Sequence, residues 1–147
     1  MNAYVKLDRY KQELAKIYSH RSQNYDESEW HSQITHRLVA SAQIKPGDKV
    51  LDIATGTCHI AIEVAQLVGN NGRVVGIDIS SGILEQARKK VAQLNLTNIE
   101  FQLADGENID FPANSFDLIF CANAFPLMAE KAATLRLCLS FSNLVVA

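Results

Sequence analysis

Beyond residue 48, the chain alternates between short apolar runs and stretches with helical character. Residues 49–53 and 74–79 are compact apolar runs bounded by turn residues. Between them, residues 60–68 are mostly apolar, and residues 81–94 place apolar side chains on one face at helical spacing. Alternation of strand and helix leaves room for right-handed crossovers, so the pattern predicts strands that pair in parallel.

Two later segments differ in a way that orders the predicted sheet. Residues 99–103 alternate strictly between apolar and polar, as an edge strand with one solvated face would. Residues 116–122 are apolar except for Asp117, which is typical of a central strand covered on both faces. We therefore expect the order 3-2-1-4, a helix over 129–141, and the start of a fifth strand, beside strand 4, at 144–147. The expected fold class is α/β, a three-layer sandwich around a mostly parallel sheet.

The first 44 residues are predicted to be helical. Segment 28–44 carries an apolar stripe at a spacing of four, made of Trp30, Ile34, Leu38 and Ala42. Residues 5–17 are a second, weaker candidate helix, and a Pro-Gly turn ends the region. We expect residues 1–44 to form an N-terminal helical cap on an α/β domain of residues 45–147, within one compact domain overall.

Composition and charge restrict the class of partner. The chain has 147 residues, of which 48% are hydrophobic and 20% charged, and this suits one globular domain with its own core. Its formal net charge is −2, and its only basic run is Arg88-Lys89-Lys90. We expect no nucleic-acid partner, because such proteins carry a basic face or stripe.

Neither a membrane span nor secretion is expected. No apolar run approaches the roughly 18–20 residues that cross a bilayer, and the charged start has no apolar block of a secretory signal. The three cysteines, Cys58, Cys121 and Cys138, lie far apart and resemble the thiols of a reducing compartment. The expected location is therefore cytoplasmic.

Three aspartates, Asp52, Asp78 and Asp105, follow three consecutive predicted strands. Ligands of such sheets bind at the carboxyl ends of the strands, beside the point where the strand order reverses. Each residue alone also has a structural explanation, Asp78 as a helix cap and Asp105-Gly106 as a turn. No folding requirement explains all three at one edge, so together they predict a binding site.

The loop after the first strand limits the choice of ligand. It has one glycine, Gly56, between Thr55 and Thr57, whereas a pyrophosphate-binding loop needs several glycines or a Gly-Lys ending. Gly56 alone is equally explained by a tight turn into the next helix. A ligand with a ribose, an adenine and a positive centre suits several carboxylates better than two phosphates do. S-adenosylmethionine is such a ligand.

Three segments resemble the successive motifs of class I S-adenosylmethionine-dependent methyltransferases. They are VLDIATGTCHIAIEVA, VVGIDISSGILEQARKK and FQLADGENIDFPANSFDLIFCANAF. The likeness covers about residues 18–127 and is greatest to the methyltransferases of ubiquinone and menaquinone biosynthesis and their small-molecule relatives. It implies a Rossmann-like fold, S-adenosylmethionine as cofactor and a small-molecule methyl acceptor.

The resemblance also implies a set of cofactor-binding residues. The loop from Asp52 to Thr57 would face the methionine end of the cofactor. Asp78 would bind the ribose, and the Asp105 loop would meet the adenine. Cys121 to Asn123 would lie beneath the ligand near the transferred methyl group, and Tyr25 would cover it. The residues expected at the site are Tyr25, Asp52, Ala54, Thr55, Gly56, Thr57, Asp78, Ile79, Asp105, Gly106, Glu107, Cys121 and Asn123.

Two departures from the family pattern are expected to matter. Ala54 and Cys58 stand where the family's loop has glycine. Ala54 is tolerated if its φ is negative, and Cys58 is expected to pack at the start of the helix. The family's sheet has seven strands, and segments for the last two are missing here. We expect a C-terminal truncation, an exposed apolar edge at strands 4 and 5, a homodimer through that edge, and weak or absent turnover.

Three functions stay open at this point. The chain transfers a methyl group to a small molecule, or forms the cofactor-binding part of such an enzyme. The second function is binding of the cofactor without turnover. The third is that of a nucleotide-dependent oxidoreductase. Methyl transfer requires positioning rather than a catalytic triad, and the sequence identifies no catalytic residue. His31 and His36 are five apart on a helix and face different directions, so no metal site is expected.

Overall fold

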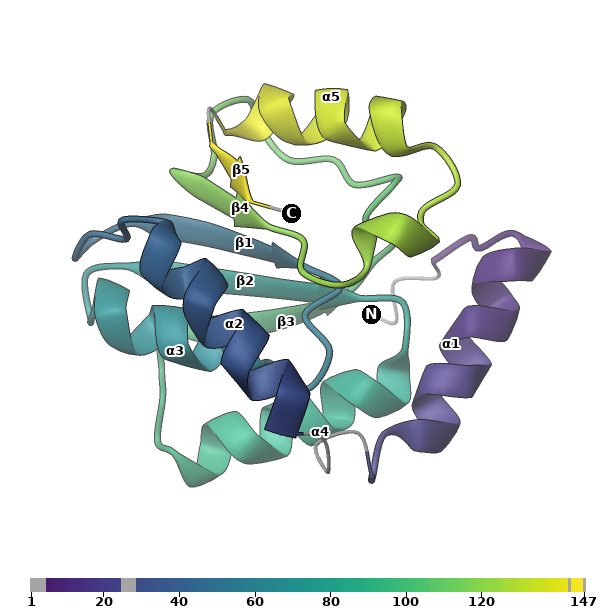
Figure 1. Cartoon of the computed structure of the whole chain (residues 1–147), viewed down its shortest axis with the longest axis horizontal. Coiled ribbons are helices and arrows are strands. Elements are labelled where there is room, and N and C mark those ends of the chain that lie inside the picture. The colour runs from purple at the N-terminus through teal and green to yellow at the C-terminus, as the bar shows by residue number, and fades with distance from the viewer. Residues whose placement is uncertain (1–4, 25–28, 143, 147) are drawn as a thin grey trace.

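The computed structural model describes residues 5–24, 29–142 and 144–146, with only the backbone of residues 29–31. Within these ranges the centre is a five-stranded sheet in the order β3-β2-β1-β4-β5, and every neighbouring pair is parallel (Figure 1). The strands are β1 (Lys49–Ile53), β2 (Arg73–Asp78), β3 (Ile99–Leu103), β4 (Leu118–Phe120) and β5 (Val145–Val146). The predicted strand order and the α/β class are confirmed.

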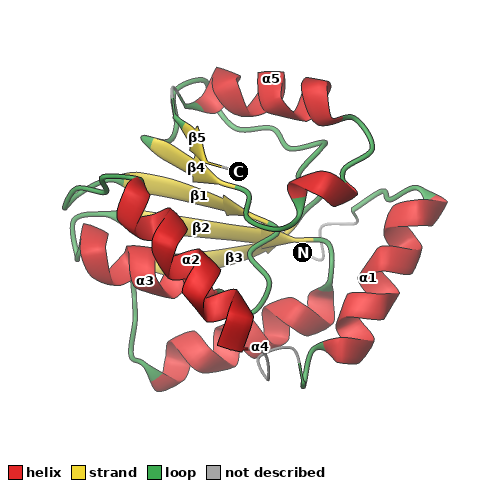
Figure 2. Ribbon diagram, viewed as in Figure 1, coloured by secondary structure: helices red, strands yellow, loops and turns green. Residues whose placement is uncertain are grey.

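Helices cover both faces of this sheet (Figure 2). They are α1 (Arg9–Arg21), α2 (Glu29–Ser41), α3 (His59–Val68), α4 (Ser81–Gln93) and α5 (Lys131–Phe141), with a short 3₁₀ helix η2 (Phe125–Leu127). Successive strand residues point to opposite faces, so Val50 and Leu51 enter different cores. Segments α2, α3 and α4 complete the core around Val50, and α5 completes the core around Leu51. None of the helices in the described ranges is long and apolar enough to cross a membrane.

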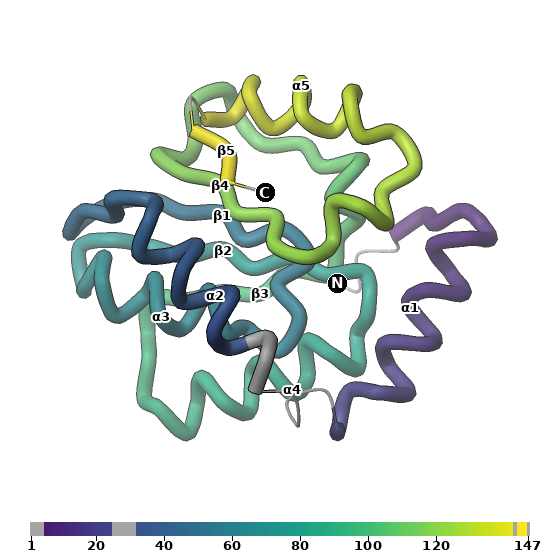
Figure 3. The backbone as a smooth tube through the Cα atoms, viewed as in Figure 1, coloured from purple at the N-terminus to yellow at the C-terminus, as the bar shows by residue number. Residues whose placement is uncertain are grey.

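Helix α1 stands apart from the two cores. The chain trace in Figure 3 shows it beside the end of the sheet toward which the strands run, where it contacts α4. It begins at Arg9 rather than at residue 5, because the Asp8 carboxylate accepts from the Lys11 N–H at 2.8 Å and caps the helix there. It also continues to Arg21, into a segment whose polar sequence favoured irregular structure.

The fourth strand is shorter than its apolar run. Asp117, directly before it, donates its main-chain N–H to the Lys49 carbonyl oxygen, and its carboxylate accepts from the Lys49 N–H at 2.8 Å. The side chain thus takes the place of a main-chain acceptor, and the regular strand begins only at Leu118. The register against β1 pairs Leu51 with Ile119.

Strand β5 forms the edge of the sheet opposite β3. It pairs with β4, and no other described strand lies on its far side. Leu135 and Leu139 of α5 are 40% and 49% exposed, and Leu144, next to β5, is 47% exposed. We refer to β5 and these three leucines as the C-terminal edge.

Candidate functional site

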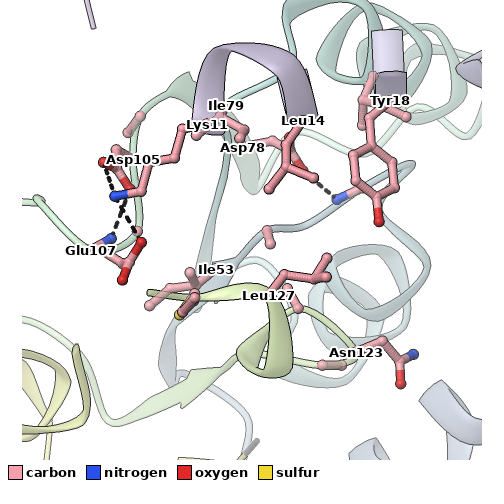
Figure 4. Close-up of a pocket in the computed structure, with 18 residues that line it drawn as sticks. Lys11, Leu14, Tyr18, Ile53, Asp78, Ile79, Asp105, Glu107, Asn123 and Leu127 are labelled. Atoms are coloured by element: carbon pink, nitrogen blue, oxygen red, sulfur yellow. Dashed lines mark hydrogen bonds and ion pairs between the residues drawn. The ribbon is translucent and has the colours of Figure 1, made fainter. Parts of the chain in front are cut away.

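The loops that follow β1, β2, β3 and β4 line two adjoining pockets at the carboxyl end of the sheet (Figure 4 shows the larger). Their cavity volumes are about 110 and 40 Å³. The pockets share Ala54, Gly56, Ala122 and Asn123, so they are two parts of one site. The site lies beside β1 and β4, where the strand order reverses and where ligands of such sheets bind.

Most of the predicted site residues line these pockets. The larger pocket is lined by Ala54, Gly56, Asp78, Ile79, Asp105, Gly106, Glu107 and Asn123, and the smaller one by Asp52, Ala54, Thr55, Gly56, Thr57 and Asn123. Cys121 lies instead in the core with α5, where it is 2% exposed. Burial raises the pKa of its thiol to about 12, and the charge of Asp52 and the neighbouring Cys138 add to the shift. Tyr25 lies outside the described residues.

Asp78 ends β2 at the wall of the larger pocket. Its Oδ2 accepts from the Gly56 N–H at 3.1 Å, and its Oδ1 accepts from the Ser80 N–H at 2.9 Å. Burial raises the pKa of this carboxyl, although the N–H groups of Ser80, Gly56 and Ile79 oppose the shift. Ser80, rather than Asp78, caps α4 by accepting from the Ile83 N–H. A carboxylate has about four acceptor positions, so Asp78 retains capacity for hydroxyl groups of a ligand.

The loop after β1 has a left-handed backbone at three positions. The φ angles are +55° at Ala54, +57° at Gly56 and +64° at Cys58. The condition under which Ala54 is tolerated without strain, a negative φ, is therefore not met. Both residues that replace the family's glycines lie where an L side chain is strained. Cys58 is fully buried at the start of α3 and packs in the core, as expected.

Asp52 forms part of the smaller pocket although it is only 2% exposed. The Thr55 hydroxyl donates to its Oδ2 at 2.7 Å. Burial raises the pKa of this carboxyl to about 7; the Thr55 hydrogen bond opposes the shift, and the charge of Asp78 adds to it. Asp52 therefore changes its charge close to neutral pH at a wall of the site.

Gly106 has a packing role beside its place in the pocket lining. A Cβ at this position would lie 2.4 Å from Ile53 Cγ2, closer than such atoms can approach. Asp105 Oδ1 accepts from the Glu107 N–H at 3.0 Å and closes a turn around the glycine. The loop after β3 thus approaches β1 closely because residue 106 has no side chain.

Sequence analysis missed the contribution of α1. Its residues Lys11, Leu14 and Tyr18 line the larger pocket (Figure 4). Lys11 Nζ lies 2.7 Å from Asp105 Oδ2 and 2.7 Å from Glu107 Oε2. Positions 11, 14 and 18 share one helical face, which was the available signal. The acidic loop after β3 therefore has a cationic partner that the predicted site lacked.

Comparison with known proteins assigns the family. A family described as a methyltransferase domain matches residues 44–144. The chain is 36% identical over 130 residues to the ubiquinone/menaquinone biosynthesis C-methyltransferase UbiE of Xanthomonas axonopodis pv. citri, over 84% of this chain and 51% of that protein. It is 37% identical over 112 residues to the aklanonic acid methyltransferase DauC of Streptomyces sp. (strain C5), over 75% and 51%. The chain thus spans about half the length of these curated relatives.

Solved structures agree with this assignment. The crystal structure of an S-adenosylmethionine-dependent methyltransferase from Aquifex aeolicus matches with 25% identity and a TM-score of 0.67, over 93% of this chain and 68% of that one. The [4+2]-cyclase SpnF matches with a TM-score of 0.79 at 18% identity, over 92% and 58%, which shows the fold alone. The Rossmann-like fold is confirmed, and the oxidoreductase alternative is not favoured. The chain belongs to the S-adenosylmethionine-dependent methyltransferases, whose cofactor the sequence predicted.

Proposed function

We propose that this chain binds S-adenosylmethionine across the two pockets and is the cofactor-binding part of an enzyme that methylates a small molecule. The observation that carries the proposal is the gathering of Asp52, Asp78 and Asp105 around one site at the strand-order reversal. Carboxylates accept hydrogen bonds from hydroxyl and amine groups and attract a positive sulfur. These are the groups that the cofactor presents.

The proposal gives each part of the cofactor its own residues. Asp78 accepts from the ribose hydroxyls with the acceptor capacity that its main-chain donors leave. The adenine lies at Ile79, Asp105, Gly106 and Glu107; the methionine end lies at Asp52, Ala54, Thr55, Gly56 and Thr57; Asn123 lies beneath the ligand. The N-terminal helices α1 and α2 cover the domain of residues 45–147.

Positioning is the chemical role of this chain. The cofactor supplies a methyl group on a positively charged sulfur, which a nucleophile of the acceptor displaces in line. Alignment of donor and acceptor at near-attack distance provides much of the rate in such a displacement. Gly56 and Asn123 line the junction of the two pockets. A ligand that occupies both pockets has its centre at this junction.

A small organic acceptor agrees with the names of the relatives. One is named for ubiquinone and menaquinone biosynthesis and the other for aklanonic acid. Binding of the cofactor without turnover is the alternative function, and relatives that are named as methyltransferases do not favour it. The buried thiols of Cys58, Cys121 and Cys138, which form no disulfide, support a cytoplasmic location, and the C-terminal edge supports a homodimer.

Calorimetric titration tests this proposal. We expect S-adenosylmethionine and S-adenosylhomocysteine to bind and NADH not to bind. Asp78→Ala should weaken binding at least about tenfold, because it removes charge-assisted hydrogen bonds of about 1.5–3 kcal/mol each. Asp110→Ala is the control, since Asp110 is exposed in the loop after β3.

Thermal unfolding of both variants separates loss of binding from loss of the fold. A folded Asp78→Ala variant whose dissociation constant stays within about threefold of wild type contradicts the ribose assignment. Tighter binding of NADH than of S-adenosylmethionine contradicts the cofactor assignment. Binding with no methyl transfer to any quinone-like or polyketide-like acceptor favours the non-catalytic alternative.

A further inference from the structure

Helix α1 extends along the larger pocket with little apolar anchoring. None of its residues is buried, although its inner face lines the pocket. At its C-terminal end, Ser19 Oγ lies 2.7 Å from Ser80 Oγ at the start of α4. Near its N-terminal end, the Tyr10 hydroxyl donates to the Leu127 carbonyl oxygen of η2 at 3.2 Å. Polar contacts therefore hold both ends of the helix.

Helix α1 also contributes a lysine to an ion cluster in the pocket lining. Lys11 Nζ lies 2.7 Å from Asp105 Oδ2 and from Glu107 Oε2, and the three side chains are 14%, 9% and 8% exposed. Glu107 Oε1 accepts from the Glu130 N–H, at the start of α5, at 2.7 Å. Lys11 thus ties α1 to the loop after β3 and, through Glu107, to the start of α5.

Lys11 and Glu107 of this cluster are ionised at neutral pH. Burial alone would lower the pKa of Lys11, but the hydrogen bonds and charges of Asp105 and Glu107 outweigh it and raise the pKa. Burial alone would raise the pKa of Glu107, but Lys11 and the N–H groups of Glu130 and Ala129 lower it. The contact is therefore an ion pair in a site where water screens little of the attraction.

We propose that Lys11 is a latch on the cofactor pocket, whose ammonium competes with the adenine amine of the ligand for Asp105 and Glu107. This rests on the proposed function, which gives these carboxylates to the adenine. Asp105 Oδ1 accepts from the Glu107 N–H, and the Lys11 ammonium contacts Oδ2 from within the pocket lining, so it occupies the side from which a ligand amine would approach that oxygen.

Displacement of Lys11 has a consequence for the whole helix. When the Lys11 ammonium leaves Asp105 and Glu107, the Tyr10 hydroxyl still donates to η2 near the N-terminal end of α1. The Ser19–Ser80 contact stays at the other end of the helix. The N-terminal half of α1 is then free to swing, so ligand entry and release are coupled to movement of this helix.

The first test needs no ligand. Amide hydrogen exchange is measured on the whole chain for wild type, Lys11→Met and Lys16→Met. Lys16 is the matched control, because it lies on the same helix in an exposed pair with Glu13 whose side chains are 72% and 59% exposed. We expect Lys11→Met to speed exchange of the α1 amides about tenfold and to leave β1 and β2 protected. Unchanged exchange in α1 overturns the latch.

The second test measures association of S-adenosylhomocysteine by stopped flow. Lys11→Met should raise the association rate constant at least about threefold without weakening the affinity, and Lys16→Met should change neither. Weaker affinity in Lys11→Met with an unchanged association rate makes Lys11 a ligand-binding residue and overturns the proposal. If Lys11→Met does not fold, Lys11→Gln, which keeps a donor without the charge, carries the same expectations.

The two tests also separate the latch from the proposed function. Absence of S-adenosylhomocysteine binding in wild type defeats the proposed cofactor site and, with it, the competition. The exchange measurement then still decides whether Lys11 holds α1. Binding in wild type together with unchanged α1 exchange in Lys11→Met leaves the cofactor site intact and defeats the latch alone.

Discussion

Asp52 links the stability of the fold to pH. Burial raises its pKa to about 7 from an ordinary value of 3.8, so the folded chain holds this proton more tightly than the unfolded chain. The contribution of Asp52 to the free energy of unfolding is therefore full below about pH 4 and is lost as the pH rises through 7. The same ionisation provides a negative charge for the methionine end of the proposed ligand.

The variant Asp52→Asn should remove this dependence. It keeps an oxygen acceptor for the Thr55 hydroxyl but carries no charge. Relative to wild type, its free energy of unfolding should rise by about 2–3 kcal/mol between pH 5 and pH 8, since each pKa unit corresponds to about 1.4 kcal/mol. Urea unfolding at several pH values measures the difference, with the exposed Asp110→Asn as control. Parallel curves for wild type and Asp52→Asn would show that Asp52 does not titrate in this range.

Ala54 stores backbone strain that glycine would release. Its φ of +55° costs an L residue about 1–2 kcal/mol, whereas glycine loses about 0.4–1 kcal/mol through extra freedom in the unfolded chain. We expect Ala54→Gly to stabilise the fold by about 0.5–1 kcal/mol, measured as a higher denaturant midpoint. Ala61→Gly inside α3 is the contrast and should destabilise by about 1 kcal/mol or more. A less stable Ala54→Gly would mean that its methyl group packs to advantage.

The residues of the site differ in how far the neighbouring sequence predicts their position in the site. Asp52, Asp78 and Asp105 were predictable, because each lies at or just beyond the end of a predicted strand and parallel strands bring such ends to one edge. Lys11 was not, because its partner Asp105 lies 94 positions away and no local pattern links them. The positive φ at Ala54 also has no signal in the sequence, since alanine gives no indication of a left-handed turn.

Among the elements, the strands were the easiest to predict. β1 and β2 are covered on both faces, so their sequences are continuously apolar and their positions follow from hydropathy. The length of β4 was overestimated, because the Asp117 side chain replaces a main-chain partner at its start. Whether a side chain replaces a main-chain partner in this way depends on the tertiary contact with Lys49. A local sequence pattern holds no information about that contact.

Helix α1 was the hardest element to place, and for a physical reason. None of its residues is buried, so its apolar stripe is weak and its start depends on the Asp8 cap. The residues 28–44 stripe gave a clearer signal, since Val39 and Ala42 enter the core against α3. An element that is held by ion pairs and hydrogen bonds, as α1 is, leaves little periodicity in the sequence.

At the scale of the whole molecule, the sheet is complete around the site but open at the C-terminal edge. The reversal between β1 and β4 is flanked by strands on both sides, which places the pockets inside the described fold. The far side of β5, by contrast, pairs with no strand in the described ranges. The proposed cofactor site and the C-terminal edge are therefore different parts of the molecule, which mutations can alter separately.

The C-terminal edge should cause the chain to associate with a second copy. Leu135, Leu139 and Leu144 are 40–49% exposed beside an edge strand, and such edges favour pairing with another chain. Sedimentation velocity from about 1 to 100 μM should show a dimer whose dissociation constant Leu139→Lys raises at least about tenfold. Leu67→Lys is the control, because Leu67 is 48% exposed on α3, away from this edge. A monomer throughout this range, or equal weakening by Leu67→Lys, would contradict association through β5. Because Leu139 lines neither pocket, Leu139→Lys should leave cofactor affinity unchanged.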